Sequence, residues 1–401
     1  MARGRPGVAP VTSSSGPSEG PEEAEEAELR TAIRDFARSE VLPGAAARDA
    51  SGEFPAQLVE RLAELDAMGI AVPRAYGGLG QSTRLQLAAI EEVAAADAAL
   101  ASIYTAHYLA MEVLLVGADE AQKLRHLPGM AEGQRLGAFA LTEPGAGSDI
   151  GSMEATAQIS AAGWLLKGSK TFISNAREAG LLLVFAKTNP TLGFRGISCF
   201  AVDRASPNLS FSTPQDKCGL RSSPTYTVFL DGVEVAADGL IGTVGGGGKI
   251  ALEALNRARI DSAAMACGIA ARALELASSY ALSRQQFGHP ISEFQVIQLG
   301  LGEMQALLQV SRLAAREAAR LKDQGADLRE AASIAKYVAA ENCFRVVDRA
   351  LQIHGGAGFM RESEIERLYR DCRVLRIYEG TSEIQLLTIA SQVLRRADGV
   401  A

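Results

Sequence analysis

The acidic residue Glu379 stands between the apolar Tyr378 and Gly380 in the segment IYEGTSEIQ. A carboxylate in apolar surroundings is poorly solvated, which raises its pKa and makes it a stronger base toward a weakly acidic carbon. Taken alone, an acidic residue before glycine is more typical of a turn than of a catalytic base. Glu379 is therefore a candidate catalytic base only if the rest of the chain supports such a function.

Four further segments combine glycines with hydroxyl, amide or guanidinium groups. Glycine lets backbone N–H groups approach a flat or anionic ligand closely, and arginine pairs readily with phosphate. Each segment alone is typical of a polar turn, and His354 within the last is more typical of a structural hydrogen-bonding group. The four segments are LTEPGAGSD (141–149), GSKTFISN (168–175), SRQQFG (283–288) and QIHGGAGF (352–359).

In order and spacing, these five segments resemble the acyl-CoA dehydrogenase family from about residue 28 to about residue 396. The resemblance implies FAD as cofactor, with Glu379 removing the α-proton of an acyl thioester while the flavin accepts a hydride from the β-carbon. It also implies electron-transfer flavoprotein as partner and a homotetramer. Short-chain and short branched-chain members are most similar, and the thioester is acyl-CoA or an acyl group on a carrier protein.

The resemblance also assigns binding roles to individual residues, with Arg284 and Phe287 reaching the FAD of a neighbouring subunit. The substrate contacts are Ser148, Asn256, Arg259 and Gly380. The cofactor contacts are Phe139, Leu141, Thr142, Ser148, Phe172, Ile173, Ser174, Arg284, Phe287, Gln352, Gly355, Gly356, Thr381, Ser382 and Glu383.

At three positions the sequence bears on how far the family pattern applies. Phe172 stands where relatives commonly have tryptophan, which could alter redox potential or acceptor access. Asn256 stands where many have aspartate, which affects the grip on the pantetheine arm. Ala258 occupies the position at which some relatives carry the base. Because alanine has no carboxyl group, Glu379 remains the family-type base.

The elements that must position these residues follow from composition and periodicity. Of the 401 residues 47% are hydrophobic and 5% aromatic, which favours packed helices. Helical spacing runs to about Arg135, short β-rich runs follow to about residue 238, and helical spacing then returns. Pro43 is expected to end the first helix.

We predict an α+β fold that is mainly α, with a tail (1–27), an N-terminal helical domain (28–135), a middle β domain (136–238) and a C-terminal helical domain (239–401). The resemblance makes the middle domain β-barrel-like and the last a four-helix bundle.

Charge and cysteine content indicate which partners and which cellular compartment to expect. The formal net charge is -7, so the field of the whole protein repels nucleic acid and anionic lipid. No apolar run is seen to reach the ~18 residues that span a bilayer, and the N-terminus lacks the apolar stretch of a signal peptide. Five scattered cysteines are expected to be reduced core residues without a metal. A cytoplasmic enzyme that binds neither nucleic acid nor membrane is expected.

Two other classes of protein on the same fold remain as alternatives. One comprises fold relatives with other flavin chemistry, such as an oxidase or a monooxygenase. The other is a non-catalytic binding protein on the same scaffold. Glu379 favours the dehydrogenase, because flavin monooxygenases of this fold usually lack the base. The sequence leaves oxidase against dehydrogenase open, since it does not show how oxygen is kept out.

Overall fold

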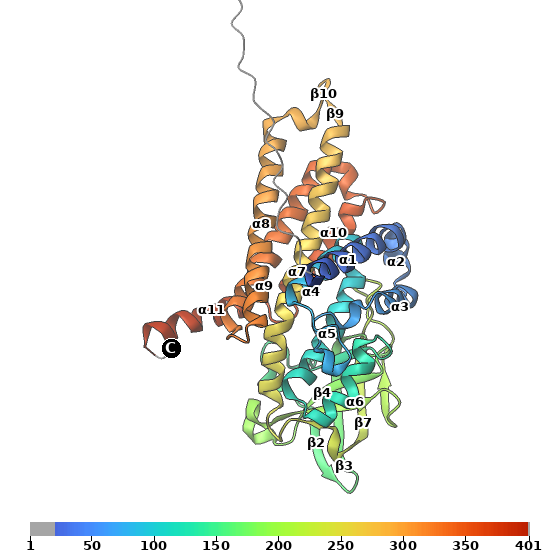
Figure 1. Ribbon diagram of the computed structural model, residues 1–401, viewed down its shortest axis with the longest axis vertical. Helices are drawn as coiled ribbons and strands as arrows, with labels where there is room; N and C mark the ends of the chain where they lie inside the picture. The colour runs from blue at the N-terminus through green and yellow to red at the C-terminus, as the bar shows by residue number, and fades with distance from the viewer. Residues whose placement is uncertain (1–20, 400–401) are drawn as a thin grey trace, which may run out of the picture.

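The computed structural model describes residues 21–399, in which a helical part, a sheet and a second helical part follow one another (Figure 1). This order confirms the predicted α+β, mainly α class. The N-terminal helices are α1 (Pro21–Phe36), α2 (Ala45–Ser51), α3 (Ala56–Glu64), α4 (Thr83–Ala96), α5 (Ala98–Gly117) and α6 (Glu120–Ala131). The C-terminal helices are α7 (Gly247–Ser283), α8 (Gln295–Asp323), α9 (Arg329–His354), α10 (Glu364–Cys372) and α11 (Ser382–Ala397).

The N-terminus differs from the sequence expectation in two ways. Helix α1 begins at Pro21, so residues 21–27 of the predicted tail are helical, whereas residues 1–20 lie outside the described part of the chain. Pro43 does not end the helical run. It lies in the first turn of a short 3-10 helix (Leu42–Gly44) that leads directly into α2. Proline is tolerated in a first turn, because the N–H it lacks has no helical partner there.

Helix α5 is long and apolar enough to cross a membrane by length and composition, which corrects the expectation that no segment reaches that limit. Of the apolar window, 83% is buried inside the protein, where α5 packs between α4, α7 and strand β1. A helix that is apolar all round is what a fully enclosed core position requires. Asp97 caps α5 by accepting hydrogen bonds from the backbone N–H groups of Ala99 and Leu100.

The middle of the chain forms one sheet of eight strands, which lies at one end of the long axis (Figure 1). Its hydrogen-bonded path is β6-β7-β3-β2-β4-β5-β8, and β1 pairs in parallel with β4. The long β3–β7 ladder is antiparallel and has two register shifts, one between Lys170 and Ile173. The strands are β1 (Gly137–Ala140), β2 (Thr156–Ser160), β3 (Gly163–Ser174), β4 (Leu181–Lys187), β5 (Ile197–Asp203), β6 (Leu209–Phe211), β7 (Thr225–Ala236) and β8 (Leu240–Ile241).

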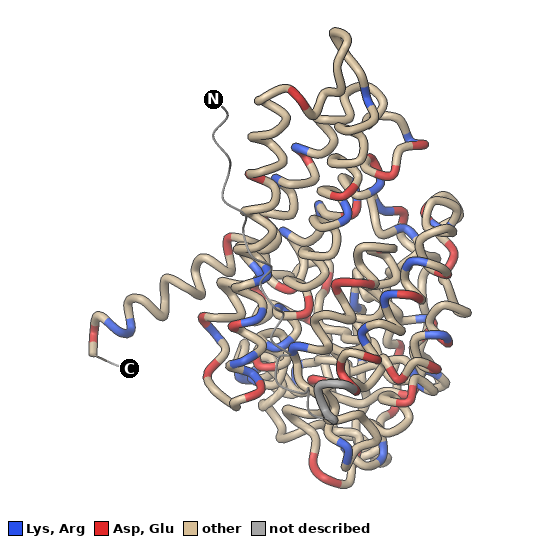
Figure 2. The backbone as a smooth tube through the Cα atoms, turned by 45° about the horizontal axis from the view of Figure 1, so that its top comes forward, with Lys and Arg blue, Asp and Glu red and all other residues tan. Residues whose placement is uncertain are grey.

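Helices α7, α8 and α9 run side by side along the long axis, with α10 against α9, while α11 projects sideways from this bundle (Figure 1). A small hairpin of β9 (Gln285–Gln286) and β10 (His289–Pro290) joins α7 to α8 at the far tip. Residues of both charges are interspersed over the molecule (Figure 2).

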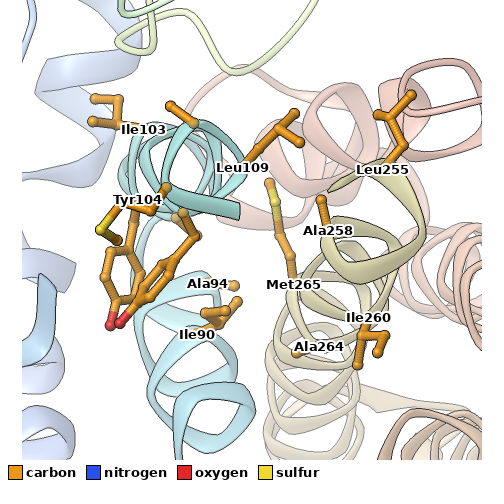
Figure 3. Packing of buried hydrophobic residues seen from close by; sticks show 14 of the residues in the cluster. Ile90, Ala94, Ile103, Tyr104, Leu109, Leu255, Ala258, Ile260, Ala264 and Met265 are labelled. Carbon is orange, nitrogen blue, oxygen red and sulfur yellow. The ribbon is translucent and has the colours of Figure 1, made fainter. Parts of the chain in front are cut away.

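The core joins the two helical parts through the packing of α4 and α5 against α7 (Figure 3). Ile90 and Ala94 of α4 and Met265 of α7 are buried there. A Cβ at Gly268 would lie 2.3 Å from the carbonyl oxygen of Glu91, so only glycine lets α7 approach α4 this closely. All five cysteines are free. Four are buried as expected, but Cys218 is exposed, because it lies in a surface loop between β6 and β7.

Candidate active site

Glu379 and Gly380 form a tight turn between α10 and α11, with φ angles of 53° and 92°. Both carbonyl groups of this turn are held by buried side chains from three helices. Arg259 Nε of α7 donates to the Glu379 carbonyl at 3.3 Å, and Lys336 Nζ of α9 donates to the Gly380 carbonyl at 2.7 Å. Gln385 Nε2 of α11 donates to both, at 3.2 and 3.0 Å. The left-handed backbone is therefore fixed by contacts from far along the chain.

The carboxylate of Glu379 accepts a hydrogen bond at Oε2 from the hydroxyl of Ser262 on α7. Burial raises the pKa of Glu379 to about 7, and the Ser262 hydrogen bond and the charges of Lys336 and Arg259 oppose this rise. Burial lowers the pKa of Lys336 to about 8, which the Glu379 charge opposes. A carboxyl group that titrates near neutral pH is suited to accept a proton from carbon.

Of the residues expected to touch substrate, Gly380 belongs to this turn and Arg259 contacts it, whereas Ser148 lies in the separate loop after β1. Arg259 and Asn256 are buried on α7 and bind each other, with Arg259 Nη1 donating to Asn256 Oδ1 at 2.7 Å. Asn256 thus orients the arginine that holds the Glu379 carbonyl. Ala258 is buried beside them and offers no carboxyl group. Within residues 21–399, the backbone N–H of Glu379 donates to no protein acceptor, so it is free for a ligand carbonyl.

A second group of predicted residues comes together where the end of β1 meets the end of β3. The Thr171 N–H donates to the Thr142 carbonyl at 2.8 Å, which joins the two segments. The Leu141 and Ile173 side chains face the core, so only their backbone can reach a ligand. Phe172, in contrast, is 67% exposed and has a φ of 58°, which turns its ring outward.

The remaining residues of this group lie on the same two segments as Thr142 and Phe172. Phe139 is half-buried, with its ring centroid 5.1 Å from that of Phe185, and Ser174 is half-buried at the end of β3. Ser148 is exposed in the loop after Thr142. Gly145 and Gly147 in the same loop are exposed, and a Cβ at either would meet nothing within 4 Å, so this part of the loop is open to the outside. An exposed aromatic ring on a segment bonded to an open, glycine-containing loop fits a flat polar ring system such as flavin.

The loop that carries Thr142 is anchored by an ion pair that the sequence did not indicate. Lys170 is fully buried, and its Nζ lies 2.6 Å from Glu143 Oε1 and 3.1 Å from the Leu141 carbonyl. Glu143 also accepts from the backbone N–H groups of Glu154 and Ala155. Because both charges are desolvated but fully hydrogen-bonded, this pair fixes the position of the loop.

We expect Lys170→Met to lower the free energy of unfolding by about 3 kcal/mol, because it leaves the buried Glu143 carboxylate without its counter-charge. The double variant Lys170→Met, Glu143→Gln should recover at least half of this loss. Lys249→Met, at an exposed lysine, is the control. Urea unfolding followed by circular dichroism measures the effect, and a loss below about 1 kcal/mol for Lys170→Met would contradict it.

A third group of predicted residues lies at the far tip of the helices. Arg284 and Phe287 are exposed at the β9–β10 hairpin, where Phe287 is 91% exposed with a φ of 53°. Gln352, Gly355 and Gly356 are exposed at the end of α9, and a Cβ at either glycine would meet nothing within 4 Å. The stacking of Tyr280 on His354, with centroids 4.5 Å apart, joins the two regions. His354 also hydrogen-bonds the Ala350 carbonyl, as a structural group would.

The last predicted cofactor contacts follow Glu379 directly. Thr381 caps α11 by accepting from the Ile384 N–H at 3.3 Å. Ser382 is buried and donates to Glu341 at 2.6 Å, whereas Glu383 is exposed. The Ser382 hydroxyl is thus engaged with protein. Within the described part of the chain, no group of three or more His, Cys, Asp or Glu residues could hold a metal ion.

A carboxylate whose pKa is raised by burial and an exposed aromatic ring joined to an open loop are features that a flavin-dependent oxidoreductase acting on an acidic C–H bond requires. Three family models match the chain: the acyl-CoA dehydrogenase N-terminal domain (residues 23–134), middle domain (138–233) and C-terminal domain (245–394). The chain therefore belongs to the acyl-CoA dehydrogenase family. It is an FAD-dependent acyl-CoA dehydrogenase by family.

The known relatives extend over nearly the whole chain. A protein named 3-(aryl)acrylate reductase from Clostridium sporogenes is 42% identical over 92% of this chain and 98% of its own. An acyl-CoA dehydrogenase of Bacillus subtilis is 40% identical with the same coverage. Among solved structures, butyryl-CoA dehydrogenase from Megasphaera elsdenii gives a TM-score of 0.91 at 34% identity, covering 95% of this chain and all of that one.

One further structural match bears on the electron partner. A chain solved in a study of the electron transferring flavoprotein of Acidaminococcus fermentans gives a TM-score of 0.91 at 34% identity. It covers 92% of this chain and 98% of that chain.

Proposed function

We propose that this enzyme oxidises a short-chain acyl-CoA to its trans-2-enoyl-CoA, with Glu379 as the base that takes the α-proton. The observation that carries the proposal is the Glu379 carboxylate, which is held in a fixed turn and whose pKa burial raises to about 7. The short-chain substrate class is supported by the similarity to butyryl-CoA dehydrogenase.

The residues around the turn have separate tasks. Arg259, Lys336 and Gln385 fix the backbone, so the carboxylate is held in one place before substrate arrives. The free N–H of Glu379 binds the thioester carbonyl and stabilises the negative charge that develops as the α-proton leaves. Ser148 would border the same thioester, as the family resemblance implies.

The proposed cofactor contacts fall into two sets. The Thr142 loop and the exposed Phe172 would hold the flavin ring next to Glu379, and Thr381, Ser382 and Glu383 would contact it from the start of α11. FAD, when bound, supplies the hydride acceptor for the β-carbon.

The far-tip residues point to an assembly in which subunits share cofactors. Arg284 lies 22 residues along α7 from Ser262, which contacts Glu379, and at 1.5 Å per residue this is roughly 33 Å. We infer that Arg284 and Phe287 bind the FAD of another subunit in a homotetramer. The exposed apolar residues of α8 and α11 support such an assembly, because a monomer rarely leaves so many uncovered. They are Val296, Leu299, Val310, Leu313, Leu386, Leu387, Val393 and Leu394.

Replacing Arg284 by alanine should lower FAD retention, because a charge-assisted pair with the pyrophosphate is lost. We expect roughly tenfold weaker FAD binding, with a larger share of small oligomers when FAD is removed. Flavin absorbance per chain and light scattering measure both. Arg204→Ala, at an exposed arginine after β5, is the control. Equal flavin retention in Arg284→Ala and Arg204→Ala would contradict the shared site.

A second candidate function is the reverse reaction, the reduction of an enoyl thioester. It is favoured by the reductase name of a 42% identical relative. A carboxyl group whose pKa lies near 7 can serve either direction, since it is ionised enough to take a proton and protonated enough to return one.

Anaerobic titration of the holoenzyme with saturated and unsaturated acyl-CoA esters of increasing length tests the proposal. We expect bleaching of the oxidised flavin by a short saturated ester, and re-oxidation by electron transferring flavoprotein faster than by oxygen. Reaction only with unsaturated esters, after chemical reduction, would instead support the reductase. Peroxide formation at the rate of turnover would support an oxidase, and reaction only with carrier-bound acyl groups would replace acyl-CoA as substrate.

A further inference from the structure

Ser262 lies on α7 one helical turn after Arg259 and is buried. Its hydroxyl donates to Oε2 of Glu379. Among the hydrogen bonds of residues 21–399, none reaches the other carboxylate oxygen, Oε1. The two oxygens of the base are therefore in different situations, one held by the protein and the other available to a ligand.

The other polar groups near the carboxylate act on it only through their charge or through the backbone. Arg259 and Lys336 hydrogen-bond the carbonyl groups of the turn instead of the carboxylate. The Tyr378 hydroxyl donates to the sulfur of Met265 at 3.3 Å. The charges of Arg259 from α7 and Lys336 from α9 act directly on the base, and the charge of the base acts on Asp261 from α7 and on Tyr378 from the turn. Glu341 from α9 and Glu383 from α11 act on Lys336.

The carboxylate of Asp261, the residue before Ser262, is hydrogen-bonded to α4 and not to Glu379. Its Oδ1 accepts a hydrogen bond from Gln86 Nε2 of α4 at 2.8 Å, so it faces the N-terminal helices. Ser262 is thus the hydroxyl group that distinguishes the two oxygens of Glu379.

We propose that Ser262 is a positioning residue for the base: it holds Oε2 of ionised Glu379 and leaves Oε1 to accept the substrate proton. This inference rests on the proposed function, in which Glu379 takes the α-proton. A hydroxyl that donates to a carboxylate stabilises its ionised form, which lowers its pKa. Ser262 therefore keeps more of the base active at a given pH, and it also restricts the rotation of the carboxylate.

Removing the Ser262 hydroxyl should raise the pKa of Glu379. In Ser262→Ala the ionised form of Glu379 loses its hydrogen bond, so the acid limb of the pH profile moves to higher pH. A lost charge-assisted hydrogen bond corresponds to a shift of about one pH unit. Below the limb, flavin reduction by acyl-CoA should therefore be about tenfold slower than in the unaltered holoenzyme, while well above it the rates should be within about threefold.

The test compares flavin reduction across pH in the unaltered holoenzyme, Ser262→Ala and Ser278→Ala. Ser278 is a matched control on the same helix, since its hydroxyl donates only to the Leu274 carbonyl one turn back. A second variant, Ser262→Cys, keeps nearly the same side-chain volume but donates only a weak hydrogen bond. The acid limb of its pH profile should therefore lie between those of the unaltered holoenzyme and Ser262→Ala.

A direct titration of the carboxyl group provides a measurement without turnover. Infrared difference spectra across pH report the carboxylate band of Glu379, which is assigned by its loss in Glu379→Gln. The midpoint of this band should move upward in Ser262→Ala and stay in place in Ser278→Ala.

The outcomes separate this inference from the proposed function. An upward shift of both the limb and the infrared midpoint supports the role of Ser262. If the acid limb of Ser262→Ala does not move, or if this variant loses rate equally at all pH values, Ser262 does not have that role. The proposed function would still stand in that case, as long as Glu379→Gln is inactive. Unchanged flavin reduction in Glu379→Gln itself would instead overturn the proposed function.

Discussion

Replacing Glu379 by glutamine should slow flavin reduction by a short-chain acyl-CoA by ~100-fold or more, since loss of the general base removes the proton acceptor from the transition state. Glutamine keeps the size of the side chain and can still accept from Ser262, so the turn should stay intact. Ala258 offers no replacement carboxyl group. FAD content and acyl-CoA affinity are therefore expected to change little.

Stopped-flow bleaching of the oxidised flavin band measures this effect. Glu362→Gln, at an exposed glutamate before α10, is the control and should react at the unaltered rate. Bleaching of Glu379→Gln at the same rate as the control would show that another group takes the proton. That result would leave the family assignment and the fold unchanged, but it would refute proton removal by Glu379.

Replacing Gly380 by alanine should slow the same step by ~10- to 100-fold, because a small displacement of a catalytic group is costly. Gly380 has a φ of 92°, a conformation that strains any other residue. An added Cβ would lie 2.6 Å from Nε2 of Gln385, which would be pushed from the Glu379 and Gly380 carbonyl groups. The base should thus lose its fixed position while keeping its chemistry.

Gly129→Ala in α6 is the matched control, since a Cβ there meets only Gln134 Oε1 at 3.9 Å. Flavin reduction and FAD content should be measured for both variants. Equal rates in Gly380→Ala and Gly129→Ala would mean that the turn tolerates a side chain and does not set the position of Glu379.

Local patterns in the sequence were sufficient for the longer strands and the order of the three parts, but they missed the short β6, and β8 lies beyond the predicted end of the middle domain at residue 238. The runs GWLLKGSKTFIS and LLLVFAK contain β-branched and aromatic residues between turn residues, and they form β3 and β4. Helix α5 was harder to judge as a core helix, because burial on every side removes the polar face by which soluble helices are recognised.

The contacts that hold the site could not be predicted, because they join residues far apart in the sequence. Lys170 and Glu143 are 27 positions apart, Lys336 and Gly380 are 44, and Ser262 and Glu379 are 117. Nothing in the sequence around Ser262 or Lys336 distinguishes them from other polar residues of a helix. The family resemblance supplied Glu379 and its flanking motif, whereas the side chains that fix the turn appear only once the helices are packed.

The most direct test of the central claim is the rate of flavin reduction by butyryl-CoA, measured from about pH 5 to pH 9 with ordinary and α-deuterated ester. Because burial raises the pKa of Glu379 to about 7, the base is protonated below that pH and ionised above it. Flavin reduction should therefore rise as pH increases through about 7 and then level off. The α-deuterated ester should react more slowly than the ordinary one, and both features should be absent from the residual rate of Glu379→Gln. A rate that is independent of pH in this range and unaffected by α-deuteration would contradict proton removal by Glu379.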